Sequence, residues 1–111
     1  MQQEDILIPC SAAQRVLIRQ YFNQLELESS IPDLYWLPVP EELLSDLQAE
    51  HLSTCGPYAL ALEICEEGLS LETLVRAQNQ LHCECIAFAS PELVQHMLDY
   101  LNLVILQRIK V

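Results

Sequence analysis

The chain has 111 residues, of which 51% are hydrophobic, and its formal net charge at pH 7 is −11. This length suits a single domain over 1–111 with one hydrophobic core, and the apolar content argues against intrinsic disorder. The negative charge disfavours binding to nucleic acid or anionic lipid, and no uncharged apolar run reaches the roughly 18 to 20 residues that span a bilayer.

The negative charge is concentrated in one stretch. From Gln20 to Val75 there is no lysine or arginine, and the acids of this stretch account for the whole net charge of −11. We therefore expect an acidic surface that recognises a basic region of a partner protein. The start, MQQEDILIPC, lacks the features of a secretory signal, so the five cysteines indicate reduced thiols in the cytoplasm.

The N-terminal segment predicts a strand and then a helix. Residues 5–9 form a short apolar run that is typical of a strand. Ser11 and Gln14 have the spacing of a capping box, so we expect the first helix over 11–27.

A proline-rich connector at 29–40 separates this helix from the next. Prolines keep the connector extended or turned, and a strand is expected within it at 33–37. Pro40 at a helix N1 position, followed by two glutamates, predicts a second helix that ends at Gly56-Pro57.

The second half predicts three strands. An apolar run at 58–65, a glutamate-glycine turn, alternation over 69–76 and a further run at 82–89 indicate antiparallel strands. The stretch 69–76 also fits a helix capped at Ser70, but a tight turn after a strand favours a returning strand.

Ser90, Pro91 and Glu92 mark the start of a C-terminal helix, as N-cap, N1 proline and first-turn acid. Its apolar stripe comprises Val94, Met97, Leu98, Leu101, Val104, Ile105 and Ile109. This stripe should pack on the sheet or against a second copy, so a homodimer is expected as one outcome. The alternative ends the helix near Asn102 and makes 104–111 a strand.

The C-terminal half resembles the end of a PilZ domain. The likeness lies in the order of elements, with strands at 58–65 and 69–76 and then a strand, a Ser-Pro-Glu cap and a long helix over 82–109. The resemblance implies antiparallel strands in a PilZ-like partial barrel with a long C-terminal amphipathic helix. The N-terminal helices expected above do not match the family, and with them the expected fold class is α+β. It also implies a protein adaptor, by analogy with family members that lack the nucleotide.

The family's cyclic di-GMP motifs are matched only in outline. Arg15 and Arg19 have the R-x-x-x-R spacing and would be the ligand-binding residues, while EICEEG echoes the family's [D/N]-x-S-x-x-G turn. Recognition of this dianion depends on charge-assisted contacts, and Glu63, Glu66 and Glu67 bring carboxylates instead. We therefore predict no cyclic di-GMP binding.

Soft metal-ligand candidates are His51, Cys55, Cys65, His82, Cys83 and Cys85. A strand over 82–89 would put the Cα atoms of Cys83 and Cys85 about 6.6 Å apart, whereas tetrahedral zinc needs sulfurs under about 4 Å apart. C-x-C also differs from the usual C-x₂₋₄-C spacing. We therefore expect small, buried thiols, with no metal ligands and no cofactor.

Cys10 is the candidate for catalysis, because a thiol before a helix N-terminus can have a lowered pKa and act as a nucleophile. Cys10 to Arg15 is C-x₄-R, one residue short of the phosphatase C-x₅-R loop, and no glycine turns amides onto a phosphate. We predict a protein that is not an enzyme, with a Cys10-dependent phosphoryl enzyme as an alternative.

The leading prediction is a non-enzymatic, acidic adaptor that binds a basic region of another protein. Adjacent aromatic residues are typical both of interface hot spots and of cores. The partner-binding candidates are Tyr35, Trp36, Glu63, Glu66 and Glu67. A small acidic chaperone of the secretion type is a second alternative.

Overall fold

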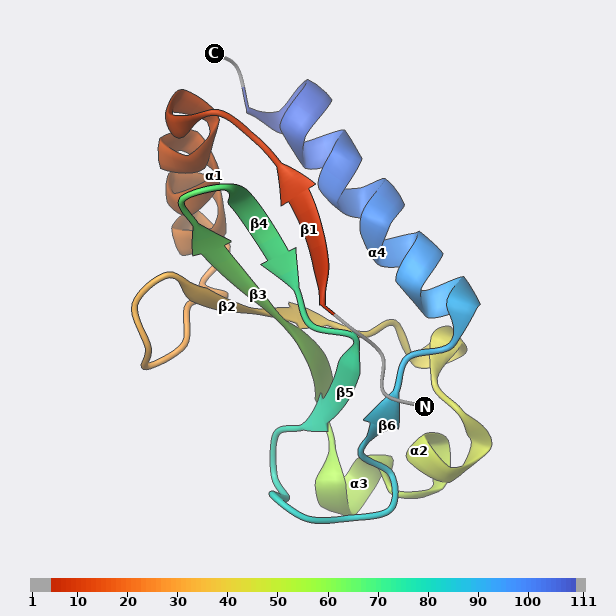
Figure 1. Cartoon of the computed structure of the whole chain (residues 1–111). Helices are drawn as coiled ribbons and strands as arrows, with labels where there is room; N and C mark the ends of the chain where they lie inside the picture. Colours follow the sequence, from red (N-terminus) through yellow and green to blue (C-terminus); the bar gives the residue numbers. More distant parts are fainter. Residues whose placement is uncertain (1–4, 110–111) are drawn as a thin grey trace.

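The structure, a computed structural model, describes residues 5–109 and has the predicted α+β fold (Figure 1). The strands are β1 (Ile6–Pro9), β2 (Leu34–Pro38), β3 (Tyr58–Cys65), β4 (Gly68–Leu71), β5 (Leu74–Ala77) and β6 (Ala87–Phe88). The helices are α1 (Ala12–Gln24), α2 (Asp46–Glu50), α3 (Leu52–Cys55) and α4 (Pro91–Leu103), with a 3₁₀ turn at Glu41–Leu43 and a π-helical segment at Val104–Arg108.

The long strand β3 organises the sheet. It pairs antiparallel with β2 over residues 59–63, with β4 through its second half and with β5 through its first two residues. β1 extends the sheet beyond β4, and β6 extends it beyond β5. The sheet does not close on itself, so the expected partial barrel is an open antiparallel sheet.

Side chains alternate across β3, so the sheet has a core face and an outer face. Leu60 and Leu62 point into the core, where they join Phe22 of α1 and Leu93 and Leu101 of α4, all nearly or fully buried. Burying one side chain of this size stabilises the fold by about 1.5–3 kcal/mol. The outer face carries the intervening residues of β2, β3 and β5, among which Trp36, Ala61 and Arg76 line a groove together with residues of the 78–86 loop.

The predicted starts of the first and the C-terminal helix are confirmed. Ser11 forms the capping box with Gln14, and Ser90 Oγ accepts a hydrogen bond from the backbone N–H of Leu93. α1 ends before residue 27, because Glu26 adopts a left-handed φ of 59°. The C-terminal helix stays helical through Arg108, so the alternative strand at 104–111 is wrong over the described residues, and 110–111 lie outside them.

The predicted second helix is wrong in detail. The chain folds as a 3₁₀ turn and two short helices, because Leu44 is extended and Ser45 starts α2 with its own capping box to Gln48. The stretch 69–76 is extended as preferred, but it forms two strands rather than one.

The strand expected at 82–89 is also wrong, because only Ala87–Phe88 pairs with a neighbour and residues 78–86 form a loop. Among residues 5–109, no helix is both long and apolar enough to cross a membrane.

Candidate metal centre

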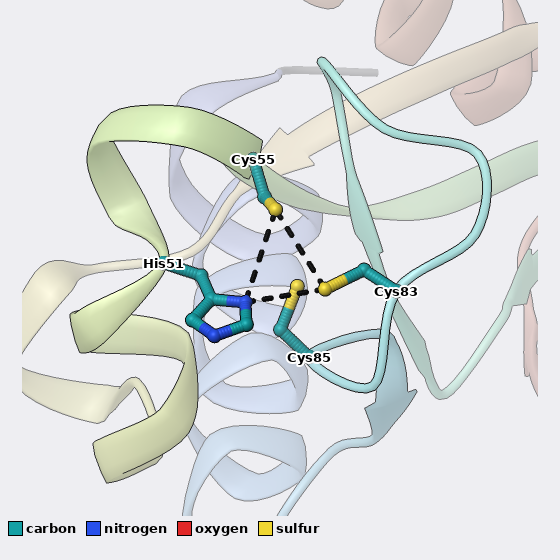
Figure 2. A group of neighbouring side chains, drawn as sticks. All are labelled: His51, Cys55, Cys83 and Cys85. Atoms are coloured by element: carbon teal, nitrogen blue, oxygen red, sulfur yellow. Dashed lines mark hydrogen bonds between the residues drawn. The ribbon is translucent and has the colours of Figure 1, made fainter.

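One histidine and three cysteines meet between α3 and the 78–86 loop that precedes β6 (Figure 2). His51 and Cys55 are four residues apart, so one turn of helix places both side chains on the same face. Cys83 and Cys85 come from the 78–86 loop. Figure 2 shows that the four side chains point toward a common centre.

The potential ligand atoms are close together. His51 Nδ1 lies 3.2 Å from Cys83 Sγ and 3.9 Å from Cys55 Sγ, and the two sulfurs are 3.7 Å apart. With Cys85 Sγ included, all four atoms lie within 4.8 Å of one another.

These separations match a tetrahedral zinc site. With Zn–S bonds of about 2.3 Å and a Zn–N bond of about 2.0–2.1 Å, neighbouring sulfurs are about 3.8 Å apart and nitrogen lies about 3.5 Å from sulfur. The separations among His51 Nδ1, Cys55 Sγ and Cys83 Sγ, between 3.2 and 3.9 Å, bracket those values. Cys85 Sγ, within 4.8 Å of the other three atoms, would be the fourth ligand.

A tight turn brings the two loop cysteines to the same side. The backbone N–H of Ile86 donates to the carbonyl oxygen of Cys83 at 3.0 Å, which closes a four-residue turn with Cys85 at its third position. A turn shortens the span between alternate residues relative to a strand. The distance argument against a C-x-C pair therefore does not apply to this conformation.

Backbone hydrogen bonds hold the start of the loop against the end of α3. Asn79 N–H donates to the carbonyl oxygen of Cys55 at 3.0 Å, and the Asn79 side-chain amide donates to that of Gly56. A Cβ on Gly56 would lie 2.6 Å from Leu52 Cδ1, so the absence of a side chain at Gly56 permits its close approach to Leu52 at the end of α3. The two ligand-bearing segments are thus joined without any metal.

Buried polar groups hold the backbone of Cys85 in place through hydrogen bonds. Gln48, only 5% exposed, donates through Nε2 to the Cys85 carbonyl oxygen at 3.0 Å. The Tyr58 hydroxyl donates to the Gln48 carbonyl oxygen at 2.9 Å. Supporting contacts of this kind fix ligands in known metal sites.

The two loop thiols have opposite electrostatic environments. Hydrogen bonds from the Cys85 backbone amide, then from the side chains of Cys85, His51 and Cys55, lower the pKa of the Cys83 thiol to about 6. Burial raises the pKa of the Cys85 thiol to about 11, with smaller contributions from the neighbouring thiols and against the opposing effect of Tyr58. A bound dication would stabilise the negatively charged thiolate of Cys85 in this buried position, since metal ligation deprotonates cysteine.

Two candidate ligands lie outside this cluster. The Cys65 thiol is directed to the Gly68 carbonyl oxygen, 3.4 Å away at the β3–β4 turn, and His82 is exposed in the loop. A sequence signal for the group that the structure brings together was the i, i+4 spacing of His51 and Cys55. It was missed because a strand was assumed for Cys83 and Cys85.

The residues proposed for nucleotide binding have other partners. Arg19 Nε donates to Asp33 Oδ1 at 2.7 Å, and Arg15 Nη1 donates to the Cys10 carbonyl oxygen at 2.9 Å. Burial raises the pKa of the Cys10 thiol despite the opposing effect of Arg15. That direction disfavours the nucleophilic thiolate.

The partner-binding candidates do not form one set. Tyr35 is 3% exposed, packs against Phe22 and donates to Asn23 Oδ1 at 2.9 Å, so it belongs to the core. Trp36 points to the outer face, where Ala61 is its partner on β3 and the exposed Glu63 follows two residues later. The remaining candidates, Glu66 and Glu67, are exposed on the β3–β4 turn.

Comparison with known proteins adds no assignment. No protein-family model, curated protein or solved structure matches the chain.

Proposed function

We propose that the protein binds one zinc ion through His51 Nδ1 and the sulfurs of Cys55, Cys83 and Cys85. The observation that carries this proposal is the convergence of four soft ligand atoms within 4.8 Å. Three thiolates and one imidazole form a common ligand set of zinc sites, and zinc accepts both donor types without a redox change.

The role of this ion is structural. Four protein ligands fill a tetrahedron and leave no position for the water or substrate that a catalytic zinc requires. The ion would join α3 to the 78–86 loop and so fix a loop that otherwise depends on a few hydrogen bonds. Metal binding then adds directly to folding stability.

Metal analysis tests this proposal. Protein purified without chelator and exchanged into metal-free buffer should retain one zinc per chain, and cobalt(II) replacing that zinc should give the intense visible bands of a tetrahedral thiolate site. Cys83→Ser should lose tight zinc binding. Cys65→Ser removes a thiol outside the cluster and should retain the full zinc content. Equal zinc content in the two variants, or none in the wild type, would refute the proposal.

A second proposed function is that of a non-enzymatic adaptor in the cytoplasm, which binds a basic region of a partner protein. The exposed Glu66 and Glu67 on the β3–β4 turn support it, together with the net charge of −11. The PilZ resemblance agrees with an adaptor that lacks cyclic di-GMP, and the secretion-type chaperone is the alternative within the same class.

Charge reversal tests the adaptor proposal. Glu66→Lys combined with Glu67→Lys should leave the free energy of unfolding within about 0.5 kcal/mol of wild type, because both side chains are solvated. Association with a basic partner should slow, with a weaker dependence of the rate on salt. An unchanged association rate would mean that these acids serve solubility alone.

A further inference from the structure

The outer face of the sheet carries a groove beside the proposed zinc site. Its floor includes Ala61, which is 8% exposed although it lies on the outer face. Trp36 is the β2 partner of Ala61 and forms one wall. Glu72, whose backbone N–H donates to the Ala61 carbonyl oxygen at 2.9 Å, lies on the opposite side.

The 78–86 loop closes one end of this groove. Gln80 and Leu81 line it, and the Leu81 side chain is 87% exposed. The groove has a volume of about 330 Å³, at the small end of the range for ligand sites. That volume is appropriate for one or two apolar side chains of a larger partner.

The charges around the groove favour a cationic partner. Arg76 is the one base among the described residues that line it, and its guanidinium binds both carboxylate oxygens of Glu72, at 2.8 and 3.1 Å. This two-point ion pair neutralises the positive charge of Arg76. Glu63 follows Ala61 on the same face, is exposed, and has no ion-pair partner among residues 5–109.

We propose that this groove binds an extended basic peptide segment, with an apolar side chain of the peptide between Trp36 and Leu81 and a lysine or arginine beside Glu63. The combination of an aromatic wall, a small-residue floor and the exposed carboxylate of Glu63, next to the lining residue Leu34 across the strand pair, matches an anchor residue beside a cation. This inference rests on the proposed function in one respect, because the zinc ion would hold the loop that carries Leu81.

The chain contains one tryptophan, so the emission of Trp36 reports on the groove directly. The probe is a short blocked peptide that alternates lysine and leucine, titrated into the zinc-loaded protein. We expect a saturable change in Trp36 emission with a micromolar dissociation constant. Peptides with glutamate in place of lysine, or serine in place of leucine, should cause no saturable change. Equal responses to all three peptides, or none to the first, would overturn the proposal.

Calorimetry on variants locates the binding site. Trp36→Ala should weaken the lysine-leucine peptide about thirtyfold, the range of an interface hot spot. Leu81→Ala and Glu63→Gln should each weaken it several-fold. Phe88→Ala is the control, because Phe88 is an exposed aromatic residue that lines a different cavity. This variant should bind the lysine-leucine peptide as wild type does. Unchanged binding by Trp36→Ala would place the peptide elsewhere and overturn the proposal.

Zinc content separates this inference from the proposed function. All four groove and control variants should keep one zinc per chain, because none of the substituted residues is in the His-Cys group. If the protein holds no zinc yet binds the peptide through Trp36, the metal proposal fails and the groove stands. If zinc is bound and the peptide is not, the groove proposal fails alone.

Discussion

Replacing Cys83 with serine should lower the stability of the protein substantially. The ion would cross-link Cys55 to Cys83, which are 28 residues apart in sequence. In a chain-entropy treatment, closing a loop of this length removes about 3–4 kcal/mol of conformational freedom from the unfolded state. Against a total stability of about 5–15 kcal/mol for a domain, that loss is large.

Urea denaturation followed by far-ultraviolet circular dichroism measures this effect. For the zinc-loaded wild type, a strong chelator should lower the free energy of unfolding by about 3–4 kcal/mol, which shifts the midpoint by about 1–3 M. Cys83→Ser should unfold near the chelated wild type and respond little to chelator. Cys65→Ser should respond as wild type does. A wild-type midpoint that chelator leaves unchanged would refute the cross-link reasoning.

Three further outcomes are expected. Leu101→Ala, at a fully buried position of α4, should lower the free energy of unfolding by about 2–5 kcal/mol. Leu106→Ala, at a position 78% exposed in the π-helical segment that follows α4, should stay within about 0.5 kcal/mol of wild type. Equal melting temperatures for the two variants would contradict the packing. Cyclic di-GMP should give no binding heat at physiological salt, because Arg15 and Arg19 already have protein partners, and a micromolar isotherm would contradict this. The raised pKa of Cys10 means that this thiol is protonated at neutral pH, so its alkylation rate should keep rising above pH 9 in the folded protein; a midpoint near neutrality would restore the enzyme alternative.

Elements that depend on local signals could be predicted from the sequence. The capping residues Ser11 and Ser90 start their helices as expected, because a cap is a contact between residues three positions apart. The β3 strand at 58–65 also matches its prediction, since its apolar residues are continuous and bounded by turn residues.

The convergence of the four His and Cys side chains depends on contacts that no local pattern encodes. Cys83 and Cys85 lie in a loop whose path is set by hydrogen bonds from Asn79 to the end of α3, across more than twenty residues of chain. The run at 82–89 was predicted to be a strand, and in a strand the two sulfurs would lie too far apart for one zinc ion. The long-range contact from Gln48 to the Cys85 carbonyl oxygen is likewise invisible in the sequence.

Strand geometry places Tyr35 and Trp36 on opposite faces of the sheet. Adjacent residues on a strand point to opposite faces, so Tyr35 and Trp36 could not share a surface once residues 34–38 were extended. The choice of which ring faces the core depends on register with β3, where Tyr35 pairs with Leu62 and Trp36 with Ala61. Pairing across a sheet is a tertiary property, so the sequence alone left that choice open.

X-ray absorption at the zinc edge tests the ligand set most directly. The purified, zinc-loaded wild type should show three sulfur neighbours at about 2.3 Å and one nitrogen neighbour at about 2.0–2.1 Å. His51→Ala should replace the nitrogen contribution with a light solvent atom while the three sulfurs remain. A spectrum with only oxygen and nitrogen neighbours, or a wild-type sample without stoichiometric zinc, would contradict zinc binding by these four residues.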